Sequence, residues 1–211
     1  MRLTKFGHAC VRIAHDDHVL VLDPGMFTQP EAVEGATAVL VTHEHADHVA
    51  VEHLRATDAP VFTIGAVARA IAEVAPDVSE RVTVVRPGET FDVGVPVRAV
   101  GEKHAVIHPD YDRIDNSGYL LQVGDQRVFH PGDALTGPDE AVDLLLAPVS
   151  GPWLKIGEAI DFARGVGAPR TLAIHDRVYS DAGLGMADQH FRRLLGDDQE
   201  WVRLADGAEL D

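Results

Sequence analysis

Two features of the sequence predict a mixed α/β fold. Short runs rich in Val, Leu and Ile recur along the 211 residues, and turn residues separate them, as is typical of strands. Between some of these runs, apolar residues recur at the spacing of a helix. An N-terminal series of strands, followed by strands that alternate with helices, forms stacked layers of sheet and helix. We therefore expect an α/β protein.

The predicted strands start with a hairpin, in which residues 10–14 and 18–23 flank a short polar turn. A second hairpin is expected where Gly124 and Asp125 separate two apolar runs. After the first hairpin, the strands are expected at residues 37–42, 59–64, 81–85, 95–100, 118–123, 126–130, 142–148 and 170–175.

Apolar spacing also predicts three helices. The first covers residues 65–75 and meets Pro76, and the second covers residues 156–167 and ends in glycine. Proline and glycine are common where helices end. The third covers residues 186–197, close to the C-terminus.

The composition favours a single globular domain over residues 1–211. Hydrophobic residues make up 45% and charged residues 25%, and no linker, repeat or low-complexity segment interrupts the chain. With 18 Lys and Arg against 34 Asp and Glu, the formal charge is −16. This charge repels phosphate backbones and anionic membranes, so neither nucleic acid nor a membrane is an expected partner.

The single cysteine, Cys10, excludes an intrachain disulfide. The opening residues, MRLTKFGHAC, contain no apolar segment typical of an export signal, and no apolar run is long enough to span a bilayer. We therefore expect a cytoplasmic protein.

The segment THEHADH, directly after the predicted strand at residues 37–42, concentrates groups that bind metals. His43 and His48 are five residues apart, whereas a zinc-protease helix needs two histidines four apart. His43 and His45 are two apart, which suits an extended turn with both side chains on one side. Asp47 and His48 then reach a second point. Imidazole and carboxylate together suit Zn²⁺ and similar ions.

Further candidate ligands follow later strands. His104 follows the strand at residues 95–100, Asp133 follows the strand at 126–130, and His175 ends the strand at 170–175. Each alone is weak evidence, because single polar residues often cap strand ends. Together with the histidine-rich segment they form a specific pattern.

These residues resemble the metallo-β-lactamase superfamily. His43, His45, Asp47 and His48 match its HxHxDH motif, and the later His, Asp and His follow in the family's order. The segments KFGHACVRI and VLDPG are similar to the lactonase-like cytoplasmic branch typified by ascorbate phosphate lactonase. The resemblance covers nearly the whole chain. It implies a four-layer αββα sandwich, and oligomers are common in that branch, so a homo-oligomer is one expected state.

The resemblance also implies two divalent metal ions, with Zn²⁺ expected and Mn²⁺ or Fe²⁺ as alternatives. One ion is assigned to His43, His45 and His104, with His108 as the rival to His104. The other is assigned to Asp47, His48 and His175. Asp133 is expected to bridge the two ions.

Four other residues have predicted roles near the site. Asp23 is similar to a family position that supports the histidine segment. His8 is expected at the edge of the site, either as a catalytic contact or as an uninvolved histidine in a turn. Glu44 is expected in solvent, facing away from His43 and His45. His45 itself favours hydrolysis, because the redox diiron branch has Glu at this position.

The predicted activity is hydrolysis of a small ester, lactone or phosphoester. A metal-bridging hydroxide would be the nucleophile, because metals lower the pKa of bound water from ~16 to about 7. Asp47 is expected to accept a proton from the water, and His8 or His175 to hold the leaving group. The alternatives are a metal-dependent phosphodiesterase or nuclease, and a non-catalytic metal-binding or sensing domain.

Overall fold

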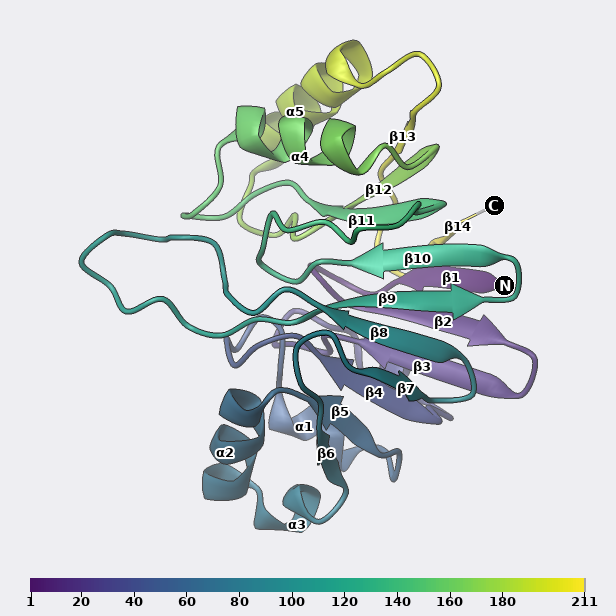
Figure 1. Ribbon diagram of the computed structural model, residues 1–211, viewed down its shortest axis with the longest axis vertical. Coiled ribbons are helices and arrows are strands. Elements are labelled where there is room, and N and C mark those ends of the chain that lie inside the picture. Colours follow the sequence, from purple (N-terminus) through teal and green to yellow (C-terminus); the bar gives the residue numbers. More distant parts are fainter. Residues whose placement is uncertain (211) are drawn as a thin grey trace.

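The computed structural model describes residues 1–210, which form two mixed seven-stranded sheets packed face to face (Figure 1). The first sheet has the order β14-β1-β2-β3-β4-β5-β6, and the second β13-β12-β11-β10-β9-β8-β7. The strands of the first sheet are β1 (Arg2–Lys5), β2 (Val11–His15), β3 (His18–Leu22), β4 (Ala38–Val41), β5 (Val61–Thr63), β6 (Val82–Val84) and β14 (Glu209–Leu210). Those of the second are β7 (Thr90–Asp92), β8 (Pro96–Val100), β9 (Gly118–Val123), β10 (Gln126–His130), β11 (Leu144–Pro148), β12 (Arg170–Ile174) and β13 (Glu200–Val202).

Helices cover the outer face of each sheet. The 3-10 helix η1 (Pro30–Val33) and the helices α1 (Val51–Arg55), α2 (Gly65–Val74) and α3 (Pro76–Ser79) lie against the first sheet. The helices α4 (Ile156–Val166) and α5 (Asp181–Leu194) lie against the second. No helix within residues 1–210 is long and apolar enough to cross a membrane.

The alternation of side chains along each strand creates the layers. In β4, Ala38 and Leu40 join the core between the two sheets, whereas Val39 and Val41 pack against the helices of the first sheet. Successive residues of a strand point to opposite faces, so an entirely apolar strand must be covered on both sides. The predicted four-layer αββα sandwich is therefore confirmed.

The predicted strands and helices are present, with three kinds of difference. The short helices η1 and α3 were not predicted from the apolar spacing. Helix α5 begins at Asp181, five residues before its predicted start at 186, because the Ser180 side chain accepts a hydrogen bond from the backbone N–H of Gly183 and caps the helix. The short strands β1, β7, β13 and β14 were not predicted. They have two to four residues, too few for a clear apolar pattern.

The direction of the strands brings many loops to one edge of the sandwich. Strands β3, β4 and β5 run parallel, as do β10, β11 and β12, and β8 runs parallel to β10 because each is antiparallel to β9. Their carboxyl ends therefore open onto the same edge. The long loop between β8 and β9 projects from this edge, at the left of Figure 1.

Candidate metal centre

Six strands deliver polar side chains to this edge, each just beyond its carboxyl end. The residues, in chain order, are His8 after β1, Asp23 after β3, His43 to His48 after β4, His104 after β8, Asp133 after β10 and His175 after β12. Of the predicted ligands and supporting residues in this list, His45 and Asp47 are part-exposed. The others are buried.

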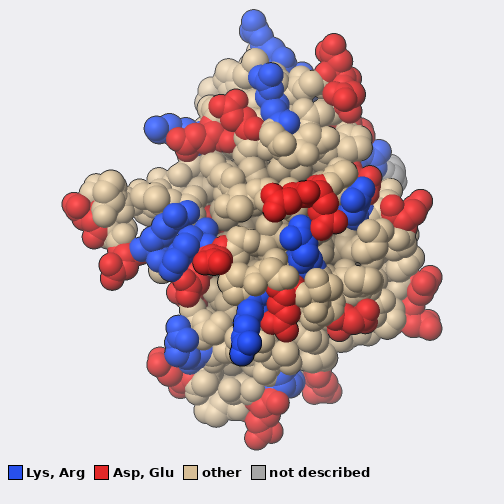
Figure 2. Space-filling model, in the orientation of Figure 1, with Lys and Arg blue, Asp and Glu red and all other residues tan. Residues whose placement is uncertain are grey.

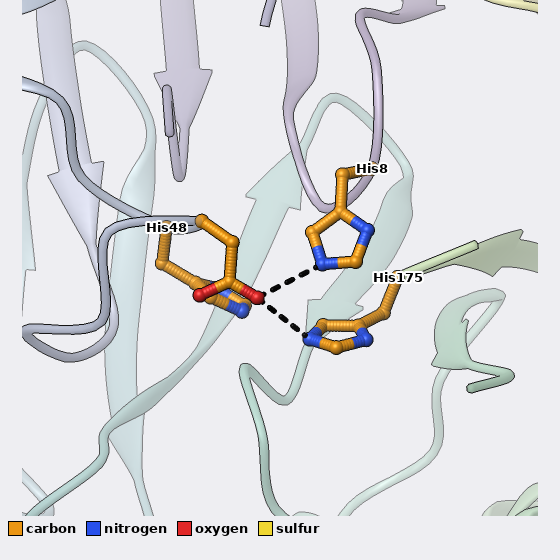
Figure 3. A group of neighbouring side chains, drawn as sticks. His8, His48 and His175 are labelled. Atoms are coloured by element: carbon orange, nitrogen blue, oxygen red, sulfur yellow. Dashed lines mark hydrogen bonds and ion pairs between the residues drawn. The ribbon is translucent and has the colours of Figure 1, made fainter. Parts of the chain in front are cut away.

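The predicted ligands gather in two groups. The first ligand group is His43, His45, His104 and Asp133, and the second ligand group is His8, Asp47, His48 and His175. Within each group, one potential ligand atom per residue lies within 4.8 Å of the others. Figure 3 shows His8, His48 and His175 gathered around one carboxylate. The carboxylate makes a hydrogen bond of 3.1 Å with His8 and an ion pair of 3.4 Å with His175.

Asp133 lies between the two groups. Its Oδ1 is 3.0 Å from Nε2 of His48 in the second group. Its Oδ2 is 3.3 Å from Nε2 of His104 in the first group and 3.2 Å from Nε2 of His175 in the second. One carboxylate therefore faces ligands of both groups, which is the arrangement that a bridging residue requires.

Asp23 orients one histidine in each group. Its Oδ2 lies 2.7 Å from Nδ1 of His48, and it also accepts a hydrogen bond of 2.8 Å from the Thr42 hydroxyl. That hydroxyl has one proton, which it gives to Asp23, so it accepts from Nδ1 of His43 at 3.0 Å. Both histidines thus carry their proton on Nδ1, and their Nε2 lone pairs face the site.

His104 is held by the backbone of the projecting loop. Its Nδ1 donates to the carbonyl of Ala105, and its own N–H bonds to the carbonyl of Ile114 at 3.1 Å. Ala105 in turn donates to the carbonyl of Asp133 at 2.7 Å. The Nε2 of His104 therefore points at Asp133, 3.3 Å from its Oδ2. As in His43 and His48, the Nδ1 of His104 is used by its support and the Nε2 faces the site.

Several of the converging atoms lack hydrogen bonds, as is expected of side chains that bind metal ions. Among residues 1–210, Nε2 of His48, Nε2 of His104, Oδ1 of Asp133 and both ring nitrogens of His175 are buried and have no partner in hydrogen-bond geometry, although Nε2 of His48 and Oδ1 of Asp133 lie 3.0 Å apart. Buried polar atoms are normally paired. Imidazole nitrogens and carboxylate oxygens that converge unpaired fit divalent cations as the missing partners.

The electrostatics also favour cations. Burial lowers the pKa of His48, but Asp133 and Asp23 outweigh burial and hold this pKa well above the usual range. Burial opposes a charged His175 as well, yet Asp133 and Asp47 raise its pKa to about 9. Burial would raise the pKa of Asp133, but His48 and His175 hold it well below the usual range. Carboxylates that attract a proton this strongly also attract a metal ion.

His8 differs from the other histidines of its group. The backbone N–H of Arg177 donates to its Nδ1 at 3.1 Å, so in the neutral ring the proton is on Nε2. Burial lowers the pKa of His8, which keeps the ring neutral. Its Nε2–H then points at Oδ2 of Asp47, 3.1 Å away. His8 is therefore a hydrogen-bond donor toward Asp47 and has no free lone pair for a metal.

A model of the β-lactamase superfamily domain matches residues 2–175, which is most of the chain and contains every predicted ligand. The chain belongs to the metallo-β-lactamase superfamily. The Mycobacterium tuberculosis protein Rv0786c is 39% identical over 194 residues, covering 88% of this chain and 89% of that protein. A Thermococcus kodakarensis protein named as a metal-dependent hydrolase is 27% identical over 227 residues. This match covers 100% of this chain and 99% of that protein.

A solved structure supports the fold of this superfamily member. Igni18, described as a novel metallo hydrolase from Ignicoccus hospitalis, superposes with a TM-score of 0.74 at 18% identity. The match covers 99% of this chain and 97% of that one. The superfamily is thus shown by sequence and fold together, whereas the lactonase-like branch stays a prediction.

Three residues support Asp133 in this metallo-β-lactamase fold. Sequence reasoning missed two of them, Trp153 and Asn116, whereas the third, Gly132, was expected to let the backbone turn there. The indole Nε1–H of buried Trp153 donates to Oδ2 of Asp133 at 2.9 Å. The side-chain oxygen of Asn116 accepts from the Asp133 N–H at 3.0 Å. Gly132 has φ +62°, and a Cβ there would lie 2.3 Å from that Asn116 oxygen, so glycine is required.

Three other residues have places that the sequence left open or described differently. His108 lies with 58% of its side chain exposed, outside both ligand groups, whereas its rival His104 lies inside the first. Glu44 was expected in solvent but is half-buried, because one of its oxygens is enclosed. Cys10 is fully buried, and burial raises the pKa of its thiol, so it behaves as a small apolar residue.

Proposed function

We propose that the chain is a metal-dependent hydrolase that uses two divalent ions to cleave a small ester, lactone or phosphoester. The convergence of both ligand groups on Asp133 carries this proposal. A buried carboxylate placed between two clusters of metal-binding atoms can bind one ion in each cluster. The superfamily and the name of the Thermococcus kodakarensis relative agree with a metal-dependent hydrolase.

We assign the first ion to His43, His45 and His104 and the second to Asp47, His48 and His175, with Asp133 shared between them. A set of imidazoles with two carboxylates suits Zn²⁺, with Mn²⁺ or Fe²⁺ as alternatives. His45 favours the hydrolytic use of such a site. We also propose that the protein acts in the cytoplasm.

Divalent ions in these two groups would lower the pKa of bound water toward 7 and polarise the oxygen of the scissile bond. The remaining steps belong to the side chains. Asp47 has 25% of its side chain exposed, so its carboxylate faces the open side of the site and can accept the proton of the attacking water. Burial raises the pKa of Asp47, but the neighbouring His175, 3.4 Å away, and the hydrogen bond from His8 outweigh it and lower this pKa, which keeps Asp47 ionised.

His8 supports Asp47 and faces the leaving group. Its Nε2–H holds Oδ2 of Asp47, and its ring is fixed from behind by the Arg177 N–H. Once Asp47 has accepted the proton of the water it is a weaker hydrogen-bond acceptor, and the same N–H can then donate to a departing oxygen beside it. His8 thus positions the proton acceptor and stabilises the leaving group.

The charge distribution favours small substrates over nucleic acids. The formal charge is −16. On the face that Figure 2 shows, acidic and basic side chains are interspersed, and the basic ones do not form a continuous stripe. A phosphodiester substrate of low molecular weight fits this surface, whereas a polynucleotide needs a basic track for its backbone.

The proposal is tested by metal analysis combined with a substrate screen. We expect two ions per purified chain and chelator-sensitive turnover of p-nitrophenyl esters, lactones or p-nitrophenyl phosphodiesters, with the preferred class identifying the substrate. His48→Ala is expected to remove nearly all hydrolysis, and His190→Ala, at an exposed position of α5 outside both groups, is the control for a histidine change. Metal without turnover on every class would favour a sensing domain, and full activity of His48→Ala would refute the assignment.

A further inference from the structure

A cavity of about 320 Å³ opens directly beside the first ligand group. His45 and His104 form one wall, and residues 105–108 and 111–114 of the projecting loop form the rest. The volume is within the range of small-molecule sites in proteins. Because two predicted metal ligands line it, the cavity adjoins the first ligand group.

The loop that forms this cavity is anchored at its neck. Lys103 and Asp115 pair as an isolated antiparallel bridge and as an ion pair of 2.5 Å. The N–H of Asn116 bonds to the carbonyl of Glu102 at 3.1 Å, next to the bond between His104 and Ile114. The neck is thus fixed to the metal centre, whereas the tip extends beyond the body of the protein (Figure 1).

Three apolar or aromatic side chains of the loop line the cavity at exposed positions. Val106, Ile107 and Tyr111 are 53%, 37% and 68% exposed, although the chain as a whole is strongly acidic. The charged residues of the cavity, Asp112 and Arg113, have opposite signs. The cavity therefore offers no net charge to a phosphate or a carboxylate, and it offers apolar contact to a neutral group.

The two ends of the centre have different chemistry. His8 and Asp47, which we assign to proton transfer and the leaving group, belong to the second ligand group. The apolar cavity lies at the first ligand group, beside His45 and His104. A substrate that spans both groups places its leaving group near His8 and its acyl substituent in the cavity.

We propose that this cavity binds the apolar acyl chain of an ester or lactone substrate. The inference rests on the proposed hydrolase function and narrows it to neutral substrates with an alkyl or aryl acyl group. Val106, Ile107 and Tyr111 determine this specificity by covering the chain. A phosphorylated acyl group is disfavoured at the same place.

The test measures kcat/KM of the metal-loaded protein for a series of p-nitrophenyl esters from acetate to hexanoate. Each methylene that enters an apolar cavity is expected to raise kcat/KM by about threefold to fourfold, so the hexanoate ester exceeds the acetate ester by about 100-fold. Ile107→Asp, which places a charge in the cavity at a part-exposed position, is expected to reduce this ratio below about tenfold. Ile107→Ala is expected to give an intermediate ratio.

The matched control is Met186→Asp on α5. Met186 is 59% exposed and lies outside the cavity, so this variant adds the same charge to an exposed apolar position. It is expected to keep the wild-type ratio of hexanoate to acetate.

A binding measurement separates this inference from the proposed function. In calorimetric titrations, free hexanoate is expected to bind at least about 10-fold more tightly than acetate, and Ile107→Asp to remove the difference. If no ester is hydrolysed but hexanoate still binds selectively, the proposed hydrolysis of esters fails and the cavity assignment stands. Equal affinities and equal kcat/KM values along the series overturn the assignment. The assignment is also overturned if Ile107→Asp alters only the oligomeric state, measured by light scattering, and leaves the ester and affinity ratios unchanged. The loop would then contact a second copy of the chain.

Discussion

The two ligand groups differ in how firmly their side chains are held. In the first ligand group, His43 is fixed through Thr42, and His104 through the backbone of its own loop. In the second ligand group, Asp23 fixes His48, but Nδ1 of His175 has no hydrogen-bond partner among the described residues. Each group has one part-exposed member, His45 in the first and Asp47 in the second. A firmly held set of ligands loses less conformational entropy when it binds an ion.

The difference divides the work of the centre. We expect the first ligand group to hold its ion more tightly and to fix the substrate beside the cavity. The second ligand group, with Asp47 facing the open side and His8 behind it, is expected to release its ion first and to carry out proton transfer. Asp133 couples the two groups, since its Oδ1 faces His48 and its Oδ2 lies between His104 and His175.

The largest effect is expected when the shared residue is removed. Asp133→Ala takes an oxygen from both groups and leaves His48 and His175 without the carboxylate that attracts cations to them. We expect loss of both ions and of nearly all hydrolysis, measured by metal analysis and p-nitrophenyl ester turnover. If the variant retained one tightly bound ion, Asp133 would belong to a single group and the bridging role would be wrong.

The next effect separates direct from relayed support. Asp23→Ala removes the partner of His48 and the end of the relay to His43, so we expect the metal affinity of both groups to fall by about 10–100-fold. Thr42→Val interrupts only the relay and is expected to weaken the first ligand group alone. Competition with a fluorescent chelator measures both affinities. Equal weakening of both groups by Thr42→Val would contradict the relay.

A smaller effect is expected at the indole that contacts the shared carboxylate. Trp153→Phe keeps the ring in place but removes the hydrogen bond to Asp133, and such a bond to a charged group contributes about 1.5–3 kcal/mol. We expect metal affinity to fall by about tenfold, near the lower end of the range for residues behind a ligand. Trp201→Phe is the control, because the Trp201 ring stacks on Phe191 and its indole N–H donates to Asp188, which belongs to neither ligand group.

Tryptophan fluorescence gives a second measure of the same contact. With Trp201 replaced by Phe, Trp153 is the remaining tryptophan, and its emission is expected to change as metal is added. An unchanged spectrum at full metal occupancy would show that the indole does not sense the carboxylate.

The ligands could be predicted from the sequence because each stands at a strand end. An apolar run identifies β4, β8, β10 or β12, and a His or Asp just beyond it stands out against that run. The parallel course of these strands then brings the residues to one edge. The four layers were expected from the family resemblance, and fully apolar strands such as β11 agree with them because such strands need cover on both faces.

The supports of the ligands could not be predicted in the same way. Trp153 contacts a residue 20 positions away, and Asn116 one 17 positions away, and neither belongs to a periodic pattern. Their roles depend on the conformation of loops, where glycines such as Gly151 set the backbone. A Cβ at Gly151 would lie 2.8 Å from the Trp153 indole nitrogen, so this glycine admits the ring to the centre.

The most direct test of the account is an anomalous-scattering map of the crystallised protein, recorded above and below the zinc absorption edge. We expect two peaks. One is predicted within ligand distance of His43, His45 and His104, the other within ligand distance of Asp47, His48 and His175, and Asp133 is predicted to contact both. A single peak at full metal loading, or two peaks of which only one touches Asp133, would contradict a shared two-metal centre.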